Sequence, residues 1–202
     1  MQRADHPAET IEVPRQVRFP VEVNPPPGFD PAQLETWPRV DGQLEYVEGR
    51  LLYMPPCGDI QSDVVSDVMR ILLGWQDAHR GFKVATNEAG IRLAGASRGA
   101  DAAVFRREDL GDYTGGFRRV PPVLAVEVAG QDEREPHLRA KAAWYLSVGV
   151  GLVWLVLPTT REVVVLTVHD ESRLRTGRLP VHDALPDLRP AVDDFFLQLA
   201  AR

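Results

Sequence analysis

The stretch Val123-Leu-Ala-Val-Glu-Val-Ala129 decides the fold, because apolar residues flank a single carboxylate, Glu127, on both sides. A short apolar run rich in β-branched residues indicates a strand that is buried on both faces. A similar run, Gly99-Ala-Asp-Ala-Ala-Val-Phe105, encloses Asp101. An ionised carboxylate in an apolar strand loses its hydration unless a partner or a metal ion compensates for that loss. Two such residues predict a functional site.

A helix is expected within the segment from Asp132 to Gly149, after the strand of Glu127. Pro136 suits the first turn of a helix, and Gly149 suits its C-terminal end. Lys141 lies on or beside an apolar stripe with helical spacing. The stripe consists of Leu138, Ala142, Tyr145 and Val148 or Gly149. The pattern therefore predicts a lysine that points toward the core.

Two carboxylates and one ammonium in this order along the chain can converge on one site. Asp101 and Glu127 can hold Mg²⁺ or Mn²⁺ together with the phosphate oxygens of a substrate. Lys141 can offset negative charge that develops on phosphorus. This is the chemistry of metal-dependent phosphodiester cleavage.

Each of the three residues also has a purely structural explanation. Asp101 can be a strand-end or turn residue, because Arg98-Gly99 precedes it. Glu127 can be one half of a structural ion pair. Lys141 can extend along the helix surface to solvent, as lysines on helix flanks usually do. The sequence alone leaves these alternatives open.

The chain has 202 residues, of which 44% are hydrophobic, and this suffices for one sizeable core. We expect a proline-rich N-terminal arm over residues 1–30 and a single domain over residues 31–202. One cysteine, Cys57, fits a reducing compartment. Neither a secretory signal nor a run of about 20 apolar residues is present, so we expect a cytoplasmic protein with no membrane partner.

The formal net charge of -6 argues against a protein that coats nucleic acid, because non-specific affinity comes from clustered lysines and arginines. It does not exclude a nuclease, because a metal-dependent nuclease site is itself acidic. Local basic clusters do exist, and each is more often solvated surface than a phosphate contact. They are Arg106-Arg107, Arg118-Arg119, and the run Arg173, Arg175 and Arg178.

Strands that alternate with two substantial helices predict a mixed β-sheet flanked by helices, an α/β or α+β fold. The clearest helix is expected over 60–78, where apolar residues recur at helical spacing. The clearest hairpin is expected over 43–54, around Glu48-Gly49. The remaining expected elements are a short helix over 31–37, strands over 82–93 and 100–105 separated by a turn-rich segment over 94–99, strands over 152–157 and 162–169, and a weaker strand or helix over 188–199.

Motifs for several other classes of chemistry are missing from the sequence. It has no Rossmann or Walker-type glycine motif, no Cys/His set with zinc spacing and no Gly-x-Ser-x-Gly. A two-carboxylate glycosidase is disfavoured, because the sequence lacks the aromatic platforms that bind sugars.

The order of motifs resembles the bacterial Uma-type "putative restriction endonuclease" family, within the PD-(D/E)XK nuclease superfamily. The likeness runs from about Pro31 to Phe196. It rests on Leu44-Glu-Tyr-Val-Glu-Gly-Arg-Leu-Leu-Tyr-Met-Pro55, Ala100-Asp-Ala-Ala-Val-Phe105, Ala125-Val-Glu-Val128, Lys141-Ala-Ala-Trp-Tyr-Leu-Ser-Val-Gly-Val150 and Val153-Trp-Leu-Val156.

The resemblance implies a restriction-endonuclease-like core with a metal site. Glu45 matches the acidic residue of the first strand motif, Asp101 the aspartate of the Pro-Asp motif, and Glu127 the glutamate of the Val-Glu-Val strand. Lys141 matches a helix lysine that precedes a tyrosine. In many relatives the lysine lies two residues after the glutamate, where this chain has Ala129. Lys141 would then reach in from the helix.

The leading hypothesis is therefore a Mg²⁺- or Mn²⁺-dependent DNA endonuclease, acting as a homodimer because one site per chain cuts one strand. Asp101 and Glu127 would bind the metal, Glu45 would complete or tune the site, and Lys141 would position the attacking water or offset charge at the phosphate. The rival hypothesis is a catalytically weakened nuclease fold that serves as a binding or assembly module.

Overall fold

The computed structural model describes residues 17, 19–131 and 133–200. The expected arm therefore lies mostly outside the described residues. The helices are α1 (Asp59–Ala78), α2 (Glu135–Ser147), α3 (Leu197–Ala200) and two short 3₁₀ helices, η1 (Leu34–Thr36) and η2 (Val192–Phe196). The strands are β1 (Val21–Val23), β2 (Gln43–Val47), β3 (Arg50–Met54), β4 (Phe82–Leu93), β5 (Ala96–Arg106), β6 (Leu124–Val128), β7 (Leu152–Leu157), β8 (Glu162–Leu166) and β9 (Glu171–Leu174).

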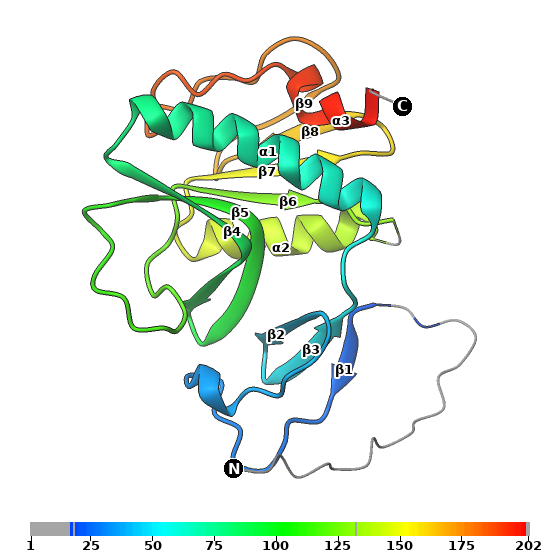
Figure 1. Ribbon diagram of the computed structural model, residues 1–202, viewed down its shortest axis with the longest axis vertical. Helices are drawn as coiled ribbons and strands as arrows, with labels where there is room; N and C mark the ends of the chain where they lie inside the picture. The colour runs from blue at the N-terminus through cyan, green and yellow to red at the C-terminus, as the bar shows by residue number, and fades with distance from the viewer. Residues whose placement is uncertain (1–16, 18, 132, 201–202) are drawn as a thin grey trace, which may run out of the picture.

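The described strands form one mixed sheet in the order β1-β3-β2-β5-β6-β7-β8-β9, and β4 also pairs with β5. Only β6 and β7 run parallel, and α2 is the crossover between them. The other pairs are antiparallel. The predicted mixed sheet flanked by helices is thus confirmed (Figure 1).

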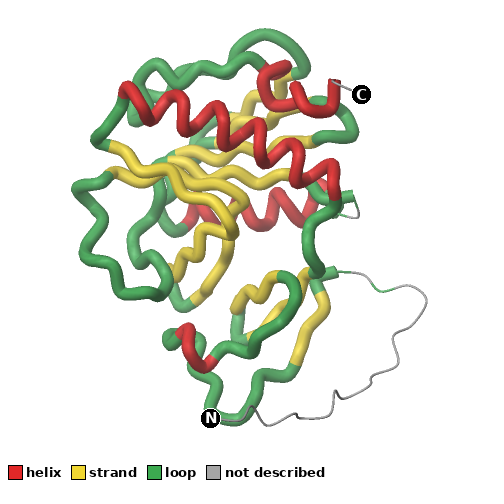
Figure 2. The backbone as a smooth tube through the Cα atoms, viewed as in Figure 1, coloured by secondary structure: helices red, strands yellow, loops and turns green. Residues whose placement is uncertain are grey.

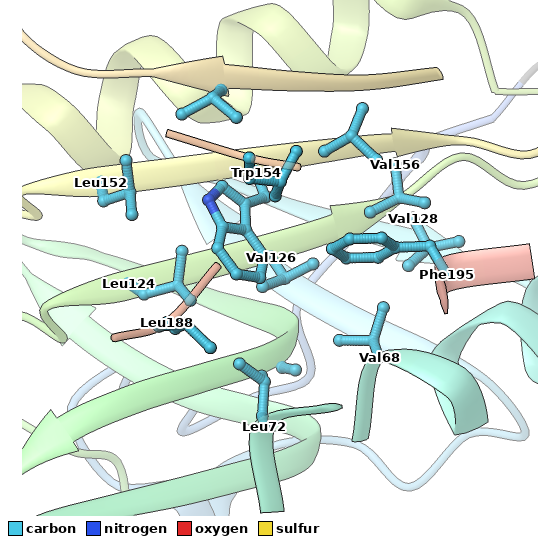
Figure 3. Close-up of a cluster of buried hydrophobic side chains, with 14 of the residues drawn as sticks. Val68, Leu72, Leu124, Val126, Val128, Leu152, Trp154, Val156, Leu188 and Phe195 are labelled. Atoms are coloured by element: carbon cyan, nitrogen blue, oxygen red, sulfur yellow. The ribbon is translucent and has the colours of Figure 1, made fainter. Parts of the chain in front are cut away.

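The two long helices cover opposite faces of the sheet (Figure 2). Alternation along each strand explains this arrangement, because successive side chains point to opposite faces. On one face, α1 packs with η2 against a core that includes Val126, Trp154 and Phe195, shown in Figure 3. On the other face, the apolar stripe of α2 packs against Ala125 and Leu155. Glu127 shares the α2 face with its alternating neighbour Ala125.

One strand, β5, is the point where the two parts of the sheet join. It pairs with β4 on one edge from Ala96 to Arg106, with a register irregularity beside Asp101. The opposite edge is shared, because β2 bonds at Ser97 and β6 bonds at residues 102–104. Residues 98–101 therefore lie in the gap between β2 and β6. This junction sets the position of the candidate site.

Most elements agree with the sequence expectations, and the hairpin of β2 and β3 turns at Glu48-Gly49 as predicted. Both residues have positive φ, 51° and 81°, as a tight two-residue hairpin turn requires. The expectation of a turn-rich segment over 94–99 was wrong. Only Ala94-Gly95 makes the turn, and β5 already begins at Ala96, because pairing with β4 continues to the end of the hairpin.

Two edge strands were not expected from the sequence. Strand β1 lies in the region assigned to the arm and pairs with β3 through Val21–Val23. Strand β9 pairs with β8 although few of its residues are apolar. Both are short edge strands, where side-chain patterning is a weak signal. No helix in the described part of the chain is long and apolar enough to span a membrane.

Candidate active site

A chain of buried charges occupies the junction of β2, β5 and β6, and it centres on Lys141 of α2. The ammonium Nζ lies 2.9 Å from Oε2 of Glu127 and 3.4 Å from Oε1 of Glu45. All three residues are buried. The helix presents Lys141 to the sheet because it falls on the same stripe as Leu138 and Ala142. The prediction that this lysine points toward the core is confirmed.

Both oxygens of Glu127 accept hydrogen bonds. Lys141 donates to Oε2, and the hydroxyl of Tyr145 donates to Oε1 at 2.7 Å. Tyr145 follows Lys141 by four residues, so one turn of α2 places both donors above the same strand. Two side chains of one helix therefore fix the orientation of this carboxylate.

Glu45 is held from the other side of the junction. Arg98 donates from Nη1 to Oε2 at 2.9 Å, and the backbone N–H of Gly99 lies 3.4 Å from Oε1. Arg98 itself is largely buried and its guanidinium lies 5.2 Å from the ring centroid of Trp144. Because β5 residues 98–101 sit in the gap, their polar groups can face Glu45 without disturbing the strand pairing. Glu45 thus links Arg98 to Lys141.

Asp101 lies next to Glu127 across the pair of strands. Ala102 pairs with Val126, so the next positions outward, Asp101 and Glu127, face each other. Oδ2 of Asp101 accepts the backbone N–H of Val128 at 2.7 Å. Asp101 is half-buried, unlike Glu127. It is therefore the more accessible of the two facing carboxylates.

Electrostatics within the cluster favour a charged lysine. Burial alone would lower the pKa of Lys141, but the carboxylates of Glu127, Glu45, Glu133 and Asp101 outweigh it and raise that pKa well above its usual range. Burial raises the pKa of Glu127, opposed by Lys141 and reinforced by the charge of Glu45. The ammonium is thus the group that allows several carboxylates to share one small volume.

The carboxylates of the candidate site fit a hard divalent cation only in part. Carboxylate oxygens are the ligands that Mg²⁺ and Mn²⁺ prefer, and Mg²⁺ commonly takes one or two carboxylates, with waters and phosphate oxygens completing its shell. Asp101 and Glu127 meet that requirement. Among the described residues, no three His, Cys, Asp or Glu side chains form a ready-made metal cage. A cation at Glu127 would have to share an oxygen that now accepts from Lys141 or Tyr145.

The structure brings together all four residues singled out in the sequence, Glu45, Asp101, Glu127 and Lys141. Asp101 lies within β5 and is not a turn residue, and Lys141 does not extend to solvent. Glu127 does form an ion pair, so its structural role is real. Sequence reasoning missed the contacts of Arg98 and Tyr145, although Tyr145 was already visible on the apolar stripe.

Comparisons with known proteins identify the family and the fold. A family model described as Uma2, "Putative restriction endonuclease", matches residues 31–200. A crystal structure of a "putative nuclease" from Anabaena variabilis superposes with a TM-score of 0.72. It is 18% identical in sequence, and the match covers 82% of this chain and 96% of that one. At this identity the likeness shows the fold. No curated protein matches the chain.

Proposed function

The chain belongs to the Uma2 family of restriction-endonuclease-like proteins, and from this premise we propose that it is a Mg²⁺- or Mn²⁺-dependent endonuclease that hydrolyses phosphodiester bonds of DNA. The observation that carries the proposal is the buried ammonium of Lys141 beside the facing pair Asp101 and Glu127. A lysine at this depth is costly unless its charge is paired, and here it is held between Glu127 and Glu45. Phosphoryl chemistry needs a fixed positive charge near phosphorus.

Each residue has a distinct role in the proposed reaction. Asp101 and Glu127 would hold the cation, which supplies positive charge to the phosphate and to the oxygens that attack and leave. Lys141 has three N–H donors; one donates to Glu127, and the ammonium also forms an ion pair with Glu45. Its ammonium would stabilise the negative charge that builds up on the phosphate oxygens. The bond from the water oxygen to phosphorus forms as the ester P–O bond breaks, leaving a phosphate monoester and a hydroxyl end.

Glu45 acts in this proposal as a positioning residue and not as a metal ligand. Its Oε2 already accepts from Arg98, and its Oε1 accepts from the backbone N–H of Gly99 and forms an ion pair with Lys141. Tyr145 plays the corresponding part for Glu127. The site therefore comprises an inner set, Asp101, Glu127 and Lys141, oriented by hydrogen bonds from β5 and α2. Preorganised groups of this kind lower the reorganisation that accompanies reaction.

A binding or assembly module is the second candidate. It is favoured by one observation: both oxygens of Glu127 are already satisfied by Lys141 and Tyr145, so the charge chain is complete within the protein itself. A site that is satisfied in this way can serve structure alone. The two candidates differ in whether metal binds and whether phosphodiester bonds break.

The test is cleavage of supercoiled plasmid DNA, with RNA as a second substrate, in Mg²⁺ or Mn²⁺ and in EDTA. Asp101→Asn and Glu127→Gln should abolish metal-dependent cleavage. Glu171→Gln is a matched control, because Glu171 pairs with Arg139 on the surface, away from the junction. Wild-type protein that cuts no substrate in either metal would favour the module. Light scattering would test the expected homodimer, which double-strand cutting by one site per chain would favour.

A further inference from the structure

Two cations and an aromatic ring form a compact cluster outside the candidate site. Nζ of Lys83 donates to the hydroxyl of Tyr113 at 2.8 Å and lies 5.4 Å from its ring centroid. The guanidinium carbon of Arg118 lies 5.1 Å from the same centroid. Tyr113 is nevertheless 78% exposed. Tyr113 is thus held by two cations and left open to solvent, and we call these three residues the Tyr113 cluster.

The backbone fixes the loop that carries two members of the cluster. Arg118 donates its N–H to the carbonyl of Gly90 at 2.9 Å, and Arg92 donates to the carbonyl of Arg118 at 2.8 Å. The loop between β5 and β6 is thus hydrogen-bonded to the free edge of β4, beside the β4–β5 hairpin (Figure 1). The cations are therefore presented by ordered backbone.

The Tyr113 cluster and the candidate site share one face of the sheet. Lys83 pairs with Phe105, and Phe105 packs on the α2 side. Asp101 lies four residues before Phe105 on β5, so alternation along the strand places it on the same face. The irregularity of β4 between Thr86 and Ala89 lies beside Asp101. Lys83 lies before this irregularity on β4, and Ile91, which bridges to Arg118, lies after it. A substrate strand that leaves the site along β4 would meet the cluster.

Charge is distributed unevenly along the chain. The segment 80–119 carries eight lysines and arginines against five acidic residues, whereas the whole chain has a net charge of -6. Neither Lys83 nor Arg118 forms an ion pair with a carboxylate among the side chains that the structure describes. An ammonium has three donors and a guanidinium five, so both retain capacity to bind an anion. The acidic remainder of the protein would repel a polyanion, which makes a local basic surface necessary.

We propose that the Tyr113 cluster binds the phosphate backbone of the nucleic-acid strand whose cleavage is proposed above. Lys83 and Arg118 would each contact a phosphate, and Tyr113 would hold the two cations on one side of the surface. The inference rests on the proposed function for its substrate, but it concerns binding and can be measured without catalysis.

The experiment measures fluorescence anisotropy of a labelled 30-base-pair DNA duplex in EDTA, from 50 to 300 mM KCl. The double variant Lys83→Gln/Arg118→Gln should bind more weakly, by roughly tenfold per lost contact at 50 mM KCl, and its plot of log K against log salt should be shallower by about 2. The matched control is Arg70→Gln/Arg80→Gln, which removes one exposed cation from α1 and one from the turn that follows it, outside the Tyr113 cluster. The control should keep the wild-type slope.

A second variant distinguishes phosphate binding by the two cations from the hydrogen bond that joins Tyr113 to Lys83. Tyr113→Phe keeps the ring but loses the bond to Lys83, so it should bind the duplex within about threefold of wild type, because both cations remain. A Lys83→Gln/Arg118→Gln variant with wild-type affinity and slope would overturn the proposal, as would equal competition by polyglutamate. If the protein binds the duplex through the Tyr113 cluster but cleaves no substrate, the proposed nuclease function is rejected. The proposal that this cluster binds nucleic acid is then still supported.

Discussion

Tyr145 donates its hydroxyl hydrogen to Oε1 of Glu127 across 2.7 Å, entirely within the core. Tyr145→Phe keeps the ring and its packing but leaves that oxygen without this donor. We expect a loss of about 1–3 kcal/mol in the free energy of unfolding, because a buried acceptor loses its partner. Tyr53→Phe is the control: its hydroxyl donates to the carbonyl of Asp41 at 2.7 Å in an exposed place, where water can replace it. Equal effects in urea unfolding of the two variants would contradict the role assigned to Tyr145.

Lys141→Met removes the ammonium while keeping most of the apolar length of the side chain. Glu127 and Glu45 would then lose a shared partner inside the core, so we expect a destabilisation of roughly 3 kcal/mol at neutral pH. Cleavage in Mn²⁺ should fall by roughly 10²-fold or more, while Mn²⁺ binding persists. Wild-type cleavage in a folded variant would remove Lys141 from the mechanism.

The same variant should respond to pH with a definite sign. Burial already raises the pKa of Glu127 in the folded protein, and loss of Lys141 raises it further. A carboxyl group with a raised pKa favours folding when protonated, so that stabilisation is lost as the pH rises through the folded-state value. The melting temperature of Lys141→Met should therefore approach that of wild type as the pH is lowered from 8 to 5. A gap that widens over this range would refute the assignment.

Asp101→Asn separates metal binding from structure. An asparagine can still accept the N–H of Val128 through its Oδ1, so the fold should be retained, with stability equal to or above that of wild type because the facing charge on Glu127 loses its like neighbour. Mn²⁺ at 100 times its Kd should stabilise wild type by about 2.7 kcal/mol and leave the variant unchanged. Differential scanning calorimetry measures both. An unfolded variant would show that Asp101 is required for structure.

Glu162 provides a test of acid stability outside the site. Arg175, Thr160 and Arg173 donate to its carboxylate and lower its pKa to about 2. A lowered pKa contributes stability above the unfolded value of 4.5, and that contribution is lost as the pH falls toward 2. The pH-dependent contribution is at most about 3 kcal/mol. Glu162→Gln should flatten the unfolding free energy between pH 4.5 and 2, and an unchanged profile would show that Glu162 does not contribute.

The sequence alone was sufficient to predict the site residues that carry a charge within an apolar segment. A carboxylate in an apolar strand and a lysine on an apolar stripe are visible without coordinates, which is why Glu127, Asp101 and Lys141 could be predicted. Arg98 could not, because the Gly and Ser residues beside it favour a turn and only the pairing of β5 with β4 overrides that preference. Strand β9 was missed for a similar reason. Its side chains are held by ion pairs with distant residues, as between Glu171 and Arg139, which no local pattern records.

The shared edge of β5 also has a consequence for folding. Strand β2 precedes β5 by about fifty residues and β6 follows it, so the two halves of the junction come from separate parts of the chain. Long-range pairings of this kind form late, because closing the intervening loop costs entropy before any contact forms. A chain in which β2 has not yet docked leaves Lys141 with Glu127 but without Glu45, the residue that links Lys141 to Arg98. The complete charge chain therefore exists only in the fully folded protein, and a nascent or partly unfolded copy lacks it.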